Sequence, residues 1–139
     1  MHRRIERAMI VYAGVAGALG VIALAVGAHA PPGWLPPPRL DAWRQAALLQ
    51  VLHAPALLAV AALSGRLHPT LGRLAQWGFA LGLPLFCLPV YGWAATGWRA
   101  AARAAPLGGL TLIAAWSLLA VAGALGTGRA GPPDADGPQ

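Results

Sequence analysis

Two histidines and one glutamine are the residues whose types and spacing could bind a ligand. Gln50 and His53 lie three residues apart, so they share one face if their apolar segment is helical. His29 directly follows the preceding apolar segment. Because imidazole nitrogens bind haem iron and other metals, the pattern suggests a small-molecule, metal or haem site between the first two apolar segments.

The same histidines also fit a structural role. His53 lies nine residues beyond Arg44 and therefore about 13 Å deeper along a helix, whereas His29 lies at the end of its segment. Histidine at membrane depth is costly unless it is paired, and an interhelical hydrogen bond worth about 0.6–1.7 kcal/mol would pair it. Two histidines of unequal depth are weak evidence for a ligand set, so we favour the structural role and expect no metal or cofactor.

The sequence contains no arrangement of residues that is typical of catalysis. The apolar segments hold no Asp, Glu, Lys or Arg, and there is no nucleophile–base pair, carboxylate dyad or phosphate loop. Ion-coupled transporters usually keep an ionisable group at membrane depth, so that class is disfavoured as well. The single cysteine, Cys87, rules out an internal disulfide and a Cys-rich metal site. We expect a protein that is not an enzyme, with Cys87 and Trp116 as core packing residues.

The distribution of charge predicts the elements that hold these side chains. Ten arginines and four acids fall into five short clusters along the chain. The charge-free stretches between these clusters are 8–38, 45–65, 74–98 and 104–128. A helix needs about 20 apolar residues to cross the ~30 Å hydrocarbon core, and every stretch is long enough. The sequence therefore predicts an all-α fold, an antiparallel bundle of four transmembrane helices.

The composition agrees with a membrane protein. Hydrophobic residues make up 58% of the chain and charged residues 10%, against about 25% charged residues in soluble domains. The formal net charge is +6, but the arginines are spread over the chain instead of forming one stripe, so we expect no nucleic-acid partner. Arginines beside apolar spans set orientation and meet anionic headgroups, which makes the lipid bilayer the expected partner.

We expect one domain with short extensions. The spans are predicted at about 9–28, 45–63, 74–95 and 106–126, after a basic tail at 1–8 and before a disordered tail at 127–139. The first span is similar to a secretory signal, but it is too long and Pro31 would follow the cleavage site, so we expect it to be retained. The Pro-rich segment 31–43 is predicted to be a loop without regular helix, with Asp41 capping the second span.

Five glycines are predicted to be helix-packing positions, because small residues let helix backbones approach closely in lipid. They are Gly14, Gly17 and Gly20 in the first span and Gly108 and Gly109 at the start of the fourth. The second group could pack against the first span.

Three prolines are predicted to kink the second and third spans: Pro55, Pro84 and Pro89. Each lacks an N–H and leaves the carbonyl four residues earlier without its usual donor, and in lipid that carbonyl needs another partner. Gln50, Thr111, Ser117 or a water molecule could supply it. The kinks could also open a cavity, which would suit a passive channel or carrier.

Arginine counting predicts that both termini lie on the cytoplasmic side of a bacterial inner membrane. With the N-terminus inside, the inner side holds Arg3, Arg4, Arg7, Arg66, Arg73 and Arg129, and the outer side holds Arg39, Arg44, Arg99 and Arg103. Four tryptophans lie near the first and third loops, which share one side in a four-span chain: Trp34, Trp43, Trp93 and Trp98.

The order of several short motifs resembles one known family, the small four-span bacterial membrane proteins catalogued as domain of unknown function 423. The matching residues are Gly27-Ala28-His29, Gln50-x-x-His53-Ala54, Leu85-Phe86, Tyr91, Thr96-Gly97, Pro106-x-Gly108-Gly109 and Trp116. The chain departs from the family pattern at Leu52, at Cys87-Leu88-Pro89 and at Ala105. A polar cluster of the family pattern therefore has fewer polar residues in this chain. The resemblance implies an inner-membrane location and no established enzyme reaction.

Three hypotheses of function follow. The first is a non-enzymatic membrane protein that acts through helix packing with itself or with a membrane partner. The second is ligand binding between the first two spans, centred on His29, Gln50 and His53. The third is a passive channel or carrier that uses the Pro-kinked third span.

Overall fold

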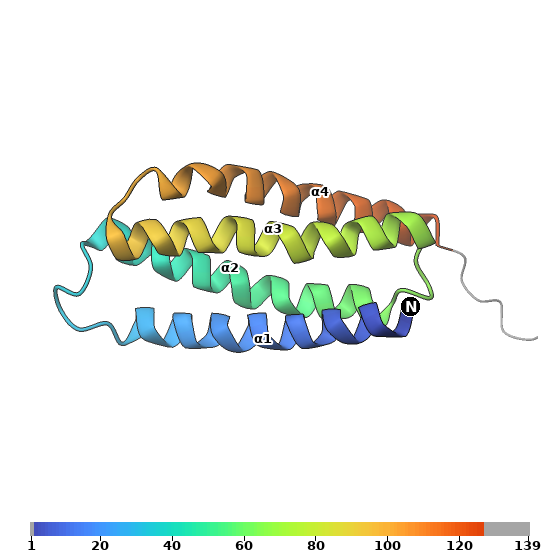
Figure 1. The fold of residues 1–139 in the computed structure, drawn as a ribbon, viewed down its shortest axis with the longest axis horizontal. Helices are drawn as coiled ribbons and strands as arrows, with labels where there is room; N and C mark the ends of the chain where they lie inside the picture. The colour runs from blue at the N-terminus through green and yellow to red at the C-terminus, as the bar shows by residue number, and fades with distance from the viewer. Residues whose placement is uncertain (1, 127–139) are drawn as a thin grey trace, which may run out of the picture.

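The computed structural model describes residues 2–126, which form four long α-helices joined by short connections (Figure 1). The helices are α1 (His2–Ala28), α2 (Pro37–Ala62), α3 (Pro69–Thr96) and α4 (Ala105–Ala124), with a short 3-10 helix η1 (Ala101–Ala104) directly before α4. The described residues contain no strand. All four α-helices are long and apolar enough to cross a membrane. The predicted all-α fold with four spans is confirmed, and the protein is a multi-pass membrane protein.

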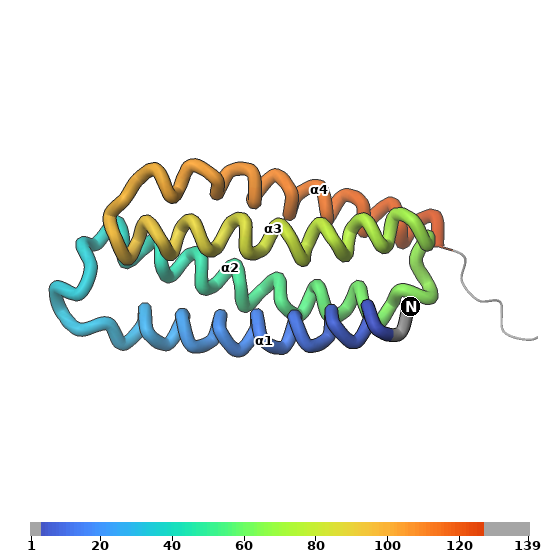
Figure 2. The backbone as a smooth tube through the Cα atoms, in the orientation of Figure 1, coloured from blue at the N-terminus to red at the C-terminus, as the bar shows by residue number. Residues whose placement is uncertain are grey.

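The helices run antiparallel to their neighbours in chain order (Figure 2). α1 packs on α2, α2 on α3, and α3 on α4. The α1–α2 and α3–α4 connections lie at one end of the bundle, and the α2–α3 connection lies at the other end with the start of α1 and the end of α4 (Figure 1). α2 and α3 are the more buried helices, whereas α1 and α4 flank them and expose more of their surface.

The Pro-rich connection is shorter than predicted. The segment 31–43 is not a loop throughout, because α2 begins at Pro37. Pro37 and Pro38 occupy the first helical positions, where the missing N–H has no intrahelical partner to lose and the fixed φ already suits a helix. Asp41 does not cap α2: the N-cap is Pro36, without a side-chain hydrogen bond. Asp41 lies one turn inside the helix, with its Oδ1 3.8 Å from Nη1 of Arg44.

α1 and α3 also begin before their predicted spans, whereas α4 ends slightly before the end of its predicted span. α1 is helical from His2, so the basic segment 1–8 belongs largely to the helix and is not a tail. Arg and Glu are good helix formers, and long side chains at a helix end can reach the headgroups while the backbone stays helical. α3 starts at Pro69, another proline at a helix start. The predicted disordered tail, 127–139, lies outside the described residues.

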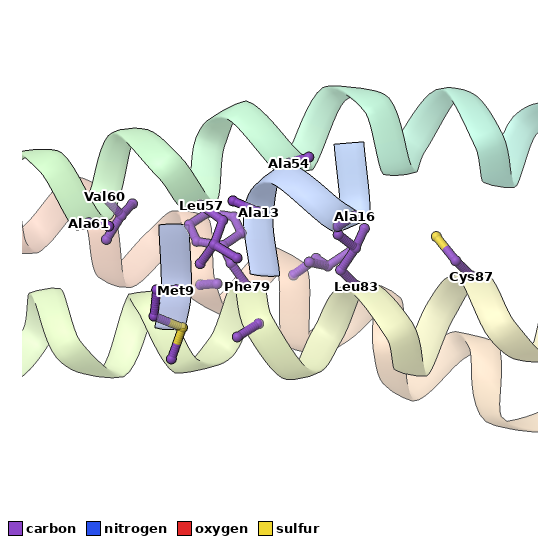
Figure 3. Packing of buried hydrophobic residues seen from close by; sticks show 13 residues of the cluster. Met9, Ala13, Ala16, Ala54, Leu57, Val60, Ala61, Phe79, Leu83 and Cys87 are labelled. Carbon is purple, nitrogen blue, oxygen red and sulfur yellow. The ribbon is translucent and has the colours of Figure 1, made fainter. Parts of the chain in front are cut away.

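The core consists of small residues around a few large ones. Phe79, Leu57 and Val60 are the largest fully buried side chains. Alanines from α1, α2 and α4 surround them, and Figure 3 shows several of these side chains between the helices. α3 and α4 approach each other closely at Gly78, where a Cβ would lie 2.8 Å from the Cβ of Ala115. Such contacts hold helices together in lipid, where apolar burial alone gives little driving force.

Candidate functional site

Gln50 forms the centre of a buried polar contact among three helices. Its side chain is only 8% exposed. Nε2 donates to the carbonyl of Ala16 on α1 at 2.8 Å, and Oε1 accepts from the hydroxyl of Tyr91 on α3 at 3.1 Å. A buried amide is costly unless its groups are hydrogen-bonded. Both ends of this amide are engaged by the protein itself, so Gln50 links α1, α2 and α3.

His53 faces the other side of the bundle, toward α3 and α4. Its Nε2 lies 3.2 Å from Nε1 of Trp116, and its Nδ1 lies 2.8 Å from the carbonyl of Leu49. Because an indole N–H can only donate, Nε2 is assigned as the acceptor and Nδ1 as the donor to Leu49. Phe79 completes the aromatic surroundings, with ring centroids 6.2 Å from His53 and 5.0 Å from Trp116. This pairing uses both ring nitrogens of His53.

His29 lies apart from the two α2 residues. It is exposed just beyond the end of α1, where Gly27 is level with Arg44. His53 lies about 13 Å deeper than Arg44 by helical rise. The structure therefore does not bring His29 and His53 together. Gln50 is hydrogen-bonded to α1 and α3, whereas the interhelical hydrogen bond of His53 is to α4. Within residues 2–126, no group of three or more His, Cys, Asp or Glu is placed to hold a metal ion.

One of the three prolines has a clear compensating contact. Pro84 cannot donate to the carbonyl of Ala80, and the hydroxyl of Tyr12 on α1 donates to that carbonyl at 2.9 Å. The hydroxyls of Thr111 and Ser117, which were expected to help, instead donate within α4 to the carbonyls of Leu107 and Ile113. Tyr12 thus supplies the donor that the Pro-containing α3 lacks.

The predicted packing glycines fall into different environments. A Cβ on Gly20 would lie 3.0 Å from a methyl group of Val51, and one on Gly17 would lie 3.5 Å from Ala54, so both face α2. Gly108 is closest to its neighbour, since a Cβ there would lie 2.6 Å from the carbonyl carbon of Leu85.

The partner of Gly108 is therefore α3, not the first span as expected. A Cβ on Gly109 would meet only the Phe86 ring, at 3.7 Å. A Cβ on Gly14 would meet nothing within 4 Å. Gly14 is therefore open to the surroundings of the bundle.

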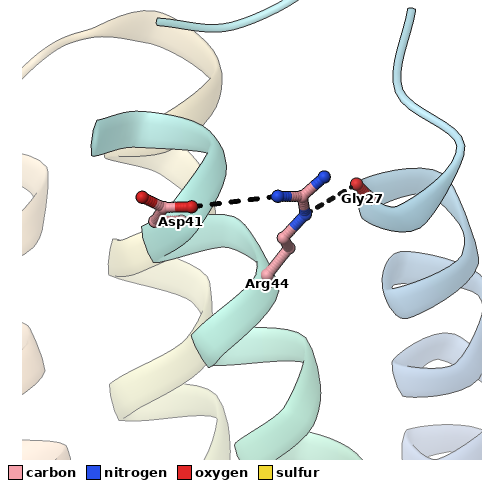
Figure 4. Close-up of polar contacts among 3 residues, drawn as sticks. All are labelled: Gly27, Asp41 and Arg44. Atoms are coloured by element: carbon pink, nitrogen blue, oxygen red, sulfur yellow. Dashed lines mark hydrogen bonds and ion pairs between the residues drawn. The ribbon is translucent and has the colours of Figure 1, made fainter. Parts of the chain in front are cut away.

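Two neighbouring residues of α2 hold the last turns of α1. The indole N–H of Trp43 donates to the carbonyl of Ala23 at 2.8 Å, and Nε of Arg44 donates to the carbonyl of Gly27 at 2.8 Å (Figure 4). The Gly27 carbonyl is one of the last four of α1, which lack intrahelical donors, and basic side chains often supply such donors. Trp43 also packs against the Tyr91 ring, with centroids 4.7 Å apart, so this contact continues to Gln50.

The sequence pointed to Gln50 and His53 but missed the roles of their partners. Tyr12 and Tyr91 carry hydroxyls inside apolar spans, and a buried hydroxyl needs an acceptor. The hydroxyls were visible in the sequence, but their acceptors were not. The acceptor of Tyr12 lies 68 residues away in the chain, and that of Tyr91 lies 41 residues away. Trp116 was expected in the core, yet its side chain is 47% exposed and only its N–H edge reaches His53.

Comparison with known proteins agrees with the motifs. The family described as Protein of unknown function (DUF423) matches residues 23–109, more than half of the chain. The chain belongs to this family. The matched part of this family member contains Gln50, His53 and Tyr91, whereas Tyr12 and Trp116 lie outside it. A search of curated proteins and a search of solved structures found no match.

Proposed function

We infer that this protein is a non-catalytic protein of the bacterial inner membrane that acts by packing α1 against α1 of a second copy. The observation that supports this function is the outward face of α1. This helix packs mainly on α2 and leaves its other side uncovered by the bundle. Gln50 and His53, the α2 residues of the predicted ligand site, are hydrogen-bonded inside the bundle, so the uncovered surface of α1 is where a function through helix packing would act.

The uncovered face of α1 contains a regular stripe of small and β-branched residues. We call it the outer stripe, and it consists of Val11, Gly14, Val15, Ala18, Val21, Ile22 and Ala25. The spacing of three and four residues places them on one side of the helix. All of them are exposed, and Gly14 has open space around it. Gly14 and Ala18 form a small-xxx-small pair of the kind that lets two transmembrane helices approach closely.

The chemistry of the outer stripe favours a second helix over lipid tails alone. Val and Ile have one strongly preferred rotamer in a helix, so they lose little freedom when they pack. The exposed face of α4 is different, because it presents bulky residues such as Leu107, Leu110 and Ile113. A second copy is the occupant that carries a matching stripe at the same depth, since both copies insert in the same direction. The pair would then be parallel and symmetric.

The packing of the interior gives less support to ligand binding or transport. The three side chains of the predicted ligand site do not converge, and His53 has partners on both ring nitrogens. For a channel or carrier at the kinked third span, the carbonyl freed by Pro84 would be a polar group for the pathway, but Tyr12 binds it. Helix packing is the hypothesis that uses the uncovered face of α1.

Disulfide formation between copies tests the proposal directly. With Cys87→Ala as background, Gly14→Cys is compared with Gly123→Cys in liposomes at high lipid-to-protein ratio. Both glycines have open space within 4 Å, but only Gly14 lies on the outer stripe. We expect rapid crosslinking at Gly14 and slow crosslinking at Gly123. Equal rates at the two positions would mean random collision and would contradict the proposal.

Bulky substitutions give a second test. Ala18→Ile should shift the oligomeric state in nanodiscs from dimer to monomer, because the added atoms keep the α1 backbones apart. Ala114→Ile on the exposed face of α4 is the matched control and should leave the dimer intact. The unaltered protein could instead be a monomer in nanodiscs and crosslink only to another protein in native membranes. That result would mean that α1 packs against a different protein and not against a second copy.

A further inference from the structure

A groove between α1 and α2 lies beside the last turn of α1. It has a volume of about 220 Å³ and is lined by Leu24, Ala28, Arg44, Gln45 and Leu48. The aliphatic side chains give it an apolar surface, with Arg44 at its mouth. Leu48 and Ala28 are exposed, so the groove is open to the lipid side of the bundle. Its shape and chemistry suit an alkyl chain that lies along the helices.

Arg44 offers a positive charge at the mouth of this groove. Its Nε donates to the carbonyl of Gly27, and its Nη1 lies 3.8 Å from Oδ1 of Asp41 (Figure 4). An arginine side chain has five N–H donors in a fixed fork. The hydrogen bond to Gly27 engages Nε and orients the guanidinium, whereas the exposed Asp41 carboxylate is too distant for a hydrogen bond to Nη1. The Nη2 group has no such contact within the described chain, so its two N–H donors are available to an anion.

The depth of Arg44 corresponds to the headgroup layer. The charge-free stretch of α2 starts directly after Arg44. Trp34 and Trp43 pack at the same end, with ring centroids 5.5 Å apart, and tryptophan pairs of this kind are typical of the membrane interface. A second hollow of about 490 Å³ lies on the other side of Arg44, between the Pro-rich connection and the start of α2. Arg44 lines both this hollow and the apolar groove, and Asp41 is the other charged residue of the hollow.

We propose that Arg44 and the groove below it form a binding site for one anionic phospholipid. The lipid phosphate accepts hydrogen bonds from the Nη2 amino group of Arg44, because charge-assisted bonds to phosphate are the strong ones. One acyl chain lies in the groove along Leu24, Ala28 and Leu48, and the headgroup extends into the hollow beside the Pro-rich connection. This site would couple lipid binding to the contact between α1 and α2, and it does not depend on the pairing of two copies.

Native mass spectrometry of the full chain tests this site. The protein is equilibrated with equal amounts of phosphatidylglycerol and phosphatidylcholine, and the lipids that stay bound are counted. We expect one firmly held phosphatidylglycerol per chain, with about tenfold preference over phosphatidylcholine, which corresponds to about 1.4 kcal/mol. Both lipids carry a phosphate, but the choline cation cancels its charge, so only phosphatidylglycerol presents a net negative charge to Arg44. Arg44→Gln should abolish the preference. Arg103→Gln removes the same charge from an exposed position at the same end of the bundle and should leave the preference unchanged.

A second variant separates the groove from the charge. Ala28→Phe fills the groove at an exposed position and keeps the bond between Arg44 and Gly27. It should lower the retention of both lipids even if Arg44→Gln proves unstable. Equal losses of preference in Arg44→Gln and Arg103→Gln would point to general surface charge and overturn the proposal. No change in Ala28→Phe, or displacement of the lipid by inorganic phosphate, would show that the groove holds no acyl chain and would overturn it as well.

Discussion

The indole N–H of Trp116 on α4 donates to Nε2 of His53 on α2, with 3.2 Å between the two nitrogens. This bond connects two helices that are not consecutive in the chain. It also fixes the imidazole, because Nδ1 then donates to the carbonyl of Leu49 on the same helix. A histidine in an apolar span is thereby satisfied without any ligand, which is the structural role that the sequence favoured.

The first prediction concerns the strength of this contact. Trp116→Phe removes the N–H but keeps a ring against Phe79, and His53→Leu removes the acceptor. Each single change leaves one polar group of an apolar span without its partner, whereas the double change removes both. We expect a coupling free energy of about 0.6–1.7 kcal/mol in a double-mutant cycle. The measurement is reversible unfolding in detergent micelles. Strictly additive effects would mean that the two side chains do not interact.

The second prediction concerns the carbonyl of Ala80, which Pro84 deprives of its helical donor. Tyr12→Phe removes the hydroxyl that binds this carbonyl and should destabilise the bundle by about 1–3 kcal/mol. Pro84→Ala restores a backbone N–H to the same carbonyl. In the Pro84→Ala background, Tyr12→Phe should therefore cost clearly less.

The same unfolding measurement distinguishes the outcomes of the second prediction. If Tyr12→Phe costs the same with Pro84 and with Pro84→Ala, then the hydroxyl stabilises the protein by some contact other than the Ala80 carbonyl.

The fold could be predicted from the sequence because one physical signal dominates it. Charge-free stretches must cross the lipid as helices, because a helix is the one structure in which a single segment forms all of its own backbone hydrogen bonds. The helix ends were harder, and α2 starts well before its predicted span. The prolines of segment 31–43 predict a loop, whereas Pro37 lies at the first helical position, where proline is favoured. Composition alone does not distinguish these two uses of proline.

The partners of the polar side chains could not be predicted from the sequence. Gln50 and His53 share an α2 face by spacing, yet one contacts α1 and α3 and the other contacts α4. The choice depends on how neighbouring helices rotate against each other, which is set by small-residue contacts such as that of Gly78 with Ala115. These contacts are not encoded in any short motif of a chain that is rich in alanine and glycine throughout.

The third prediction concerns orientation. The start of α1 and the end of α4 lie at one end of the bundle (Figure 1), and the N-terminal arginines predict that this end is cytoplasmic. Reporter fusions test it. Alkaline phosphatase placed after Gly126 should be inactive, and the same reporter inserted at Gly33, in the α1–α2 connection, should be active. The reverse pattern would invert the orientation.

The modest arginine bias has a structural reason. Two arginines at the opposite end lie at helix C-termini: Arg44 donates to the Gly27 carbonyl of α1, and Arg39 lies beside Gly97, the C-cap of α3. Positive charge near a helix C-terminus is favourable. These two residues have a local role, so they should not be counted fully against the N-terminal cluster.

The fourth prediction concerns two adjacent glycines at the start of α4. A Cβ on Gly108 would lie 2.6 Å from the carbonyl carbon of Leu85, and backbone cannot move aside as a side chain can. Gly108→Ala should therefore push α4 from α3 and destabilise the protein by about 1–3 kcal/mol. A Cβ on Gly109 would make only an ordinary contact with the Phe86 ring, at 3.7 Å. Gly109→Ala should stabilise α4 by up to about 1 kcal/mol, because alanine is the better helix former.

The opposite signs expected at Gly108 and Gly109 make the comparison sharp. Both variants add one methyl group to neighbouring positions of the same helix, so membrane insertion and propensity change equally. Unfolding free energies in one detergent decide between local packing and a general effect of glycine removal. Similar stabilisation in both variants would show that α3 and α4 do not approach each other closely at Gly108, and that the register of these two helices differs from the one described.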